Sequence, residues 1–199
     1  MAPRKLAPLP APPAALPGLD LPTFKTNQTF VRIHQLKHDP AFWGRTGNNR
    51  FDSARGNYGV LYAAETFDGA FIETFGDVSP KTVSVSSLTA RGCANVVPQR
   101  ELLLVDLAGP GLSQLGLDVR VCTDDHAVSQ AWSEALWAHP SQPDGIWYAA
   151  RHDAGQRSLA LFDRAAAAVS VSALSGLMDS PQDVITAGSV DKYGFVLLP

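Results

Sequence analysis

The chain has 199 residues, with 16 lysines and arginines against 19 aspartates and glutamates, so its formal net charge is −3. A slightly acidic chain of this length favours one domain with a single core, and it gives no electrostatic reason to expect direct nucleic-acid or membrane binding. Cys93 and Cys122 lie far apart and outside any CxxC pattern, which favours free thiols, and no apolar run reaches the roughly 18 residues of a membrane helix. We therefore expect a cytoplasmic protein.

The first 22 residues are rich in proline and alanine, and 7 of them are proline. Proline breaks up an apolar run and favours extended backbone, which indicates an extended arm rather than a signal peptide. The composition therefore predicts an arm of residues 1–22 followed by a domain of residues 23–199.

Hydrophobic periodicity predicts seven strands and three helices after the arm. The strands are expected at residues 28–34, 58–64, 81–88, 101–108, 145–150, 157–163 and 193–198. The helices are expected at residues 65–75, 123–140 and 180–188. Residues 38–50, 109–117 and 151–156 are rich in turn-forming residues and are expected to be connections. Because strands outnumber helices and do not alternate regularly with them, we expect an α+β fold rather than a doubly wound parallel sheet.

The segment 123–140 carries the clearest helix signals. Thr123, Asp124 or Asp125 is expected to cap its start, and Pro140 to end it. Its apolar stripe is expected to consist of Ala131, Trp132, Ala135 and Leu136. The helix at 180–188 is expected to begin with a serine cap.

Two arginines stand among apolar neighbours. Arg32 lies in the strand-like FVRIH, where the alternating pattern favours a solvent-facing side chain. Arg50 lies in a loop rich in glycine and asparagine, just before Phe51. Such an arginine either pins a turn or binds a phosphate, whose oxygens match its planar fork of donors.

Tyr62 and Glu73 follow closely in the chain. Tyr62 lies in a predicted strand, where tyrosine usually packs in the core, but its small neighbours Ala63 and Ala64 leave space for a flat ligand beside the ring. Glu73 lies on the predicted helix, away from the Phe67 and Phe71 face, so periodicity favours a solvated position. The functional alternative is a lone carboxylate beside a developing positive charge.

Other candidate sites are weaker. His34 and His38 are four residues apart but straddle the end of a predicted strand, so we expect no metal site. The sequence has no GxSxG, P-loop or GxGxxG motif. No serine or cysteine has an evident base beside it, which disfavours covalent catalysis.

Several of these segments, taken in order, resemble the RES domain family. They are VRIH with Arg32, NNRF with Arg50, GVLYAAETFDGAFIET with Tyr62 and Glu73, and DGIWYAARHDAGQRSLALFDR further on. The resemblance spans residues 24–198. It implies an ADP-ribosyltransferase-like α+β fold, with a split mixed β-sheet, flanking helices and a cleft for NAD.

The resemblance also implies an activity and a partner. Many members of the family are toxins that cleave the nicotinamide–ribose bond of NAD, with phosphate or water as the acceptor, and transfer of ADP-ribose to a protein is also described. The expected partner is an antitoxin, often with a DNA-binding domain, that blocks the cleft. NAD is then the substrate and no metal is implied, while a homo-oligomer remains an option.

Carried over to this sequence, the resemblance assigns catalytic roles to Glu73, Arg32 and Tyr62. Glu73 would bond the ribose hydroxyls and stabilise the positive charge that develops as nicotinamide leaves. Tyr62 would orient the nicotinamide end. Arg32 and Arg50 would hold the pyrophosphate or an acceptor phosphate, and Arg151 would contact the adenosine half.

One position departs from the family pattern. The family serine usually follows the tyrosine by two residues, but the stretch here is YAARHD, so Ala150 stands in its place. Losing one hydrogen bond to a substrate costs about 0.5–1.5 kcal/mol, and Ser158 is a candidate replacement. The sequence thus leaves three functions open: an NAD-degrading enzyme, a silent relative that binds a nucleotide or only an antitoxin, and an enzyme that transfers ADP-ribose to a protein.

Overall fold

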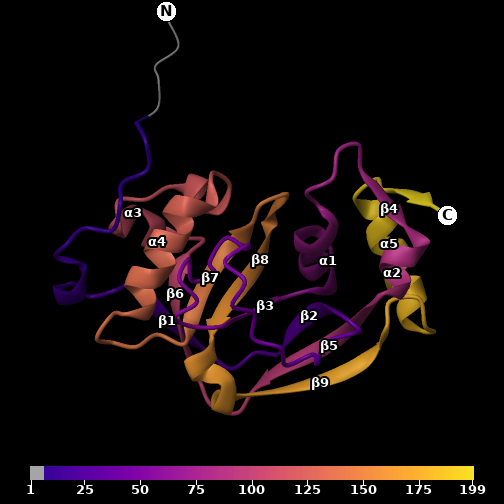
Figure 1. Ribbon diagram of the computed structural model, residues 1–199, viewed down its shortest axis with the longest axis horizontal. Coiled ribbons are helices and arrows are strands. Elements are labelled where there is room, and N and C mark those ends of the chain that lie inside the picture. Colours follow the sequence, from indigo (N-terminus) through magenta and orange to yellow (C-terminus); the bar gives the residue numbers. More distant parts are fainter. Residues whose placement is uncertain (1–6) are drawn as a thin grey trace, which may run out of the picture.

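A computed structural model describes residues 7–199 and shows an α+β protein built on an eight-stranded sheet (Figure 1). The strands of this sheet, in spatial order, are β1 (Thr23–Thr26), β6 (Leu102–Leu107), β7 (Gly145–Ala150), β8 (Asp153–Phe162), β3 (Val60–Ala64), β2 (Phe30–Gln35), β5 (Arg91–Pro98) and β9 (Val169–Gly176). A separate parallel pair joins β4 (Thr82–Ser84) to β10 (Val196–Leu198). The helices are α1 (Phe67–Phe75), α2 (Val85–Thr89), α3 (Pro110–Gln114), α4 (His126–Trp137) and α5 (Gln182–Lys192).

The large sheet is mixed, and it is weakest between β3 and β2. β6 and β7 are parallel, whereas the other neighbours in this sheet are antiparallel. β2 and β3 share the single registered pair Val31–Ala64, while β2 pairs with β5 along its whole length. Figure 1 shows the consequence: β7 and β8 rise steeply, whereas β2, β5 and β9 lie across the lower right of the view. The sheet is therefore split at β3 and β2.

Helix α1 packs beside this split. Thr66 caps it by accepting a hydrogen bond from the amide of Gly69 at 3.0 Å, which satisfies one of the free N–H groups at a helix start. Phe71, Ile72 and Phe75 face a core that also includes residues of β4, α2, β5 and α5. Burying each large apolar side chain of this face stabilises the fold by a few kcal/mol. This packing fixes the rotation of α1, so that its opposite face is turned toward the sheet.

Helix α4 covers the other part of the sheet and holds the loop before β3. Asp125 caps it by accepting from the amide of Ala127 at 2.9 Å. Trp132 and Leu136 are fully buried, as the predicted stripe required, but Ala131 is exposed. Serines fill the remaining inward positions: Ser133 donates to the carbonyl of Phe51 at 2.7 Å. A pattern of apolar residues alone misplaces the stripe, because small hydroxyl side chains bury when a carbonyl pairs with them.

The N-terminal arm lies against α4. The indole of Trp132 donates to the carbonyl of Pro10 at 2.9 Å, and Leu16 is 2% exposed inside the same core. His139 adds contacts to the carbonyls of Leu16 and Leu19. Residues 1–6 of the predicted arm lie outside the described residues.

Four predicted segments differ from the structure, and three strands were not predicted. The segment 81–88 is strand β4 followed by helix α2, because Ser84 caps a helix by accepting from the amide of Ser87 at 3.1 Å. The connection 109–117 contains the short helix α3, which starts at Pro110, and most of the connection 151–156 belongs to β8. Helix α5 starts after Pro181 without a side-chain cap and is longer than predicted. Strands β1, β5 and β9 were not predicted; β1 has only four residues, and β5 shows no clean alternation of buried and exposed residues.

Candidate active site

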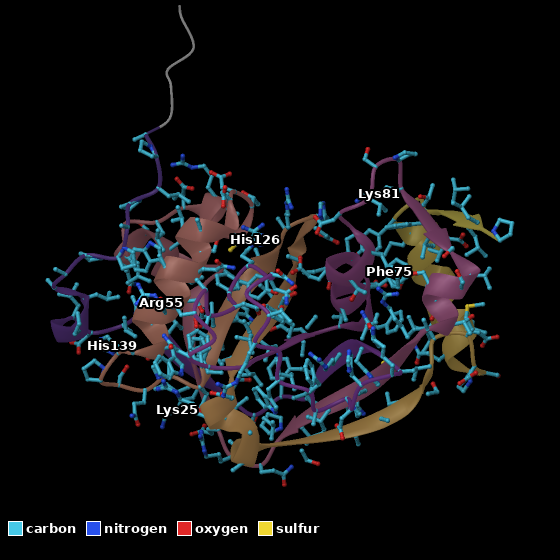
Figure 2. All side chains as sticks on the ribbon, in the orientation of Figure 1. Lys25, Arg55, Phe75, Lys81, His126 and His139 are labelled. Carbon is cyan, nitrogen blue, oxygen red and sulfur yellow. The ribbon has the colours of Figure 1, made fainter. Side chains whose placement is uncertain are left out.

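A cleft of about 390 Å³ opens where the sheet is split. Its walls come from β2, β3, α1, β7, the start of α4 and the loops before β3 and after β7. The lining residues are Arg32, Ile33, Asn49, Arg50, Tyr62, Glu73, Thr74, Asp77, His126, Tyr148, Arg151 and His152. Figure 2 labels one of them, His126, on the side of α4 turned toward the middle of the molecule. Five of the six predicted site residues thus meet in one cavity, and Ala150 does not line it.

Arg32 is anchored by main-chain oxygens. Its guanidinium donates to the carbonyl of Tyr62 at 2.8 Å and to that of Phe42 at 3.2 Å. Burial lowers the pKa of Arg32 to about 10, so the group still carries its charge at neutral pH. The expectation of a solvent-facing side chain was therefore wrong, because the split between β2 and β3 turns this part of the strand into a cleft wall.

Arg50 is held in the same manner and is only 9% exposed. Its guanidinium donates to the carbonyl of Asp124 at 2.6 Å and lies 3.4 Å from the hydroxyl of Ser129. Burial, and then the nearby charge of Arg151, lowers the pKa of Arg50. Within residues 7–199 neither Arg32 nor Arg50 forms an ion pair with a carboxylate. Two cationic groups therefore face the cleft with their charges uncompensated by direct contact.

The loop that carries Arg50 is fixed from two sides. His126 and Gln130 of α4 bond to main-chain oxygens of this loop, with His126 Nδ1 at 3.1 Å from the carbonyl of Asn48. On the other side, the buried carboxylate of Asp52 accepts from the amide of Asn49 at 3.1 Å. These contacts fix the backbone next to Arg50, independently of the hydrogen bonds that its own side chain makes.

Tyr62 reaches the same loop. Its hydroxyl donates to Asp52 Oδ1 and accepts from the amide of Phe51, both at 3.0 Å. Burial, together with the Asp52 carboxylate, raises the pKa of Tyr62 well above its usual value, so the hydroxyl stays protonated. The ring is thus fixed at the cleft wall by its own hydroxyl, and Asp52 is a supporting residue that sequence reasoning missed.

Glu73 is oriented rather than solvated, contrary to the expectation from helical periodicity. Its Oε2 accepts from the hydroxyl of Tyr148 at 3.0 Å, and its Oε1 accepts from the amide of Arg151 at 2.8 Å. The second contact depends on the register shift at the end of β7, between Ala149 and Ala150. Burial and the neighbouring Glu73 raise the pKa of Tyr148 well above its usual value, which keeps this donor protonated.

Tyr148 was not predicted as a site residue. It lies in GIWYAA, which reads as an ordinary strand, and its partner Glu73 is 75 positions away in the chain. The one available signal was the position of Tyr148 two residues before Ala150, which stands where the family usually has a serine.

The rim of the cleft carries a second group of charges. Asp77 Oδ1 accepts from the guanidinium of Arg151 at 3.0 Å and from His152 Nε2 at 2.9 Å. The hydrogen bond with His152, and then the charge of Arg151, lower the pKa of Asp77. Arg151 is exposed, so it remains free to move toward a ligand.

Ala150 lies elsewhere. It is 2% exposed and packs in the core cluster of Phe71, Phe75 and Cys93. In the part of the chain that the structure describes, no three histidine, cysteine or acidic side chains come together in a way that could hold a metal ion. Between residues 7 and 199, no helix has the length and apolarity to span a membrane.

The fold and the cleft define an α+β protein in which the carboxylate of Glu73 shares a cavity with two guanidinium groups that form no ion pair among the described residues. The RES domain model matches residues 29–182, and the chain therefore belongs to the RES domain family.

Two similar proteins were found. A protein of Sinorhizobium fredii (strain NBRC 101917 / NGR234) named "Probable toxin y4kH" is 36% identical over 107 residues, which cover 51% of this chain and 80% of that protein. A chain in the crystal structure of the M. tuberculosis MbcT–MbcA toxin–antitoxin complex superposes with a TM-score of 0.61 at 14% identity, over 83% of this chain and 92% of that one. At this identity the likeness concerns the fold alone, and it confirms the expected α+β fold with a large mixed sheet and flanking helices.

Proposed function

We propose that this protein is a toxin-type enzyme that cleaves the bond between nicotinamide and ribose in NAD, and that an antitoxin neutralises it by covering the cleft. The observation that carries the proposal is the shared cavity of Glu73, Arg32 and Arg50. Membership of the RES domain family and the likeness to a named probable toxin support it.

The proposed chemistry uses one carboxylate. As the bond from the ribose carbon to the pyridine nitrogen breaks, nicotinamide departs as a neutral molecule with the bonding electron pair, and positive charge develops on the ribose. Glu73, held by Tyr148 and the amide of Arg151, stabilises that charge, since a fixed negative group in a half-buried site is worth more than one in water. No acid is needed to protonate the leaving group.

The acceptor completes the reaction. An oxygen of water or of phosphate bonds to the ribose carbon; water gives ADP-ribose and releases its proton to solvent, and phosphate gives the 1″-phosphate. Arg32 and Arg50 bind the pyrophosphate of NAD or the acceptor phosphate, because the planar donor fork of arginine matches phosphate oxygens. Tyr62 orients the nicotinamide end, and Arg151 contacts the adenosine half.

The test measures nicotinamide release from NAD by purified protein, with and without phosphate. Release that rises with phosphate indicates phosphorolysis, and release independent of phosphate indicates hydrolysis. Glu73→Gln is expected to abolish release, while Glu101→Gln, a change at an exposed glutamate far from the cleft, is the matched control. Arg50→Ala is expected to weaken the reaction sharply, and Arg55→Ala, an exposed arginine of the same loop, leaves it unchanged.

Two rivals have distinct outcomes in the same assay. Label transferred from NAD to protein in a lysate would favour an ADP-ribosyltransferase. The departure at Ala150 favours a silent relative, for which calorimetry would detect NAD binding while no nicotinamide forms over hours. Restored activity in Ala150→Ser would strengthen this rival, but the structure predicts only a loss of stability from the added hydroxyl, because Ala150 packs in the core outside the cleft.

A further inference from the structure

A small chamber adjoins the cleft beneath α1. It measures about 50 Å³ and shares Tyr62, Glu73 and Tyr148 with the cleft. Its remaining walls include the small side chains of Ala64 and Ala70. A cavity measured in this way needs about 10–15 Å³ to hold a water molecule, and one of about 150 Å³ binds benzene, so the chamber accepts a short polar group and is too small for an aromatic ring.

One polar side chain of the chamber lacks a partner. Ser158 lies on β8, in register with Ala64 of β3 on one side and Tyr148 of β7 on the other. It is 1% exposed, and its Oγ has no hydrogen-bond partner among the described residues. A buried hydroxyl without a partner is unfavourable in the free protein, and such a group is explained when a ligand supplies the missing bond.

None of the neighbours of Ser158 supplies that bond in the structure, and the hydroxyl of Thr74, which also lines the chamber, donates to the carbonyl of Ala70. The hydroxyl of Tyr148 donates to Glu73, and the hydroxyl of Tyr62 is bonded to Asp52. The alanines of the wall carry no polar side-chain atoms. The unpartnered hydroxyl of Ser158 therefore belongs to a residue that lines the same chamber as Glu73.

We propose that Ser158 is a specificity-determining residue that binds the carboxamide group of the nicotinamide in this chamber. The inference rests on the proposed function. The pyridine ring stays in the cleft beside Tyr62, and its substituent enters the chamber, where the serine hydroxyl can donate to the carbonyl or accept from the amide. The glycosidic bond then lies within reach of Glu73, so Ser158 acts on binding and orientation while Glu73 acts on the developing charge.

The experiment compares NAD with an analogue whose pyridine ring lacks the carboxamide. Ser158→Ala is expected to lower kcat/KM for NAD by roughly five- to tenfold, the effect of one neutral hydrogen bond. The kcat/KM for the analogue should change less than about twofold, since that compound has no group for Ser158 to bind. Ser170→Ala, an exposed serine on β9, is the matched control and should alter neither value.

The variant should fold, because removing an unpartnered hydroxyl breaks no bond. A melting temperature equal to or above that of the wild type is therefore expected, and it excludes a merely structural effect. Equal losses for NAD and for the analogue would overturn the inference, as would unchanged kinetics with both, which would assign the chamber to a water molecule.

A second measurement separates this inference from the proposed function. Calorimetry of NAD and the analogue is carried out in the Glu73→Gln background with and without Ser158→Ala. A loss of NAD affinity confined to the serine variant supports the role of Ser158 even if the wild-type protein releases no nicotinamide, which is the result that would refute the proposed function. Suppose instead that Glu73→Gln binds NAD equally well with and without Ser158→Ala, while the wild-type protein releases nicotinamide. That result refutes only the role of Ser158.

Discussion

Replacing Tyr148 by phenylalanine tests whether the orientation of Glu73 matters for catalysis. The change removes the hydroxyl that lies 3.0 Å from Glu73 Oε2 and keeps the ring, which packs against Phe51 at a centroid distance of 4.8 Å. A hydrogen bond to a charged group contributes about 1.5–3 kcal/mol. If that energy is available in the transition state, kcat/KM for NAD falls roughly ten- to one-hundredfold.

Stability should change far less than activity. Water can reach the Glu73 carboxylate from the cleft and replace the lost donor, so we expect the melting temperature to shift by less than about 4 °C, or roughly 1 kcal/mol for a chain of this size. The assay is initial-rate nicotinamide release beside thermal melting. Tyr58→Phe is the matched control, because the Tyr58 hydroxyl is also buried but donates to Ser133 at 2.7 Å, inside the core; it should lose stability and retain activity. A Tyr148→Phe enzyme with wild-type kcat/KM would refute the reasoning.

Three further predictions concern the supports of the cleft. Asp52→Asn places an amide NH₂ among donors whose hydrogen bonds the carboxylate now accepts, including the hydroxyl of Tyr62. We expect the free energy of unfolding to fall by about 1–3 kcal/mol in chemical denaturation. An unchanged denaturation midpoint would contradict the role of this network. The pKa of Asp77 is lowered, first by its hydrogen bond with His152, so its contribution to stability is present above the ordinary aspartate pKa of about 4 and is lost as pH falls through the lower folded-state value. The gap in melting temperature between wild type and Asp77→Asn should therefore be present at about pH 5.5 and shrink as the pH is lowered below about 4, and a gap that is constant with pH would exclude this source. Leu16→Ala empties a core position that is 2% exposed and should lower the melting temperature by roughly 5–15 °C; a smaller change than an exposed Leu19→Ala control would show that the arm adds nothing to the core.

Local patterns were enough for the elements that frame the cleft. β3, α1, α4 and β7 fall within the predicted segments and β2 extends one residue beyond its own, because each carries its own periodicity and, for the helices, a side-chain cap. β9 was missed although Val169 and Val171 alternate with Ser170 and Ser172 at its start, which is the usual signal of a strand; in the structure it is an edge strand paired on one side alone.

The site was less accessible to sequence reasoning than the fold. Periodicity assigned Arg32 and Glu73 to solvent. It distinguishes a core-facing side chain from an outward-facing one, but it does not show whether another part of the chain lies across from the outward-facing side. Both residues face a cleft that exists because β2 and β3 separate after one registered pair, and a sheet split of this kind leaves no local signal in either strand. Asp52 and Tyr148 were missed for a related reason, because the atoms that give them meaning belong to distant parts of the chain.

The anchoring of Arg32 and Arg50 by carbonyl oxygens has a consequence for how such a protein can lose its activity. A main-chain oxygen is present whatever amino acid occupies the position, so no point mutation deletes the acceptors at Tyr62, Phe42 or Asp124. Inactivating variants should therefore cluster at side chains of the cleft, the arginines among them, and at residues that shape the backbone around them. Of the acceptor positions, Phe42 and Asp124 should tolerate exchange as long as the path of the chain is kept, whereas Tyr62 also lines the cleft with its side chain.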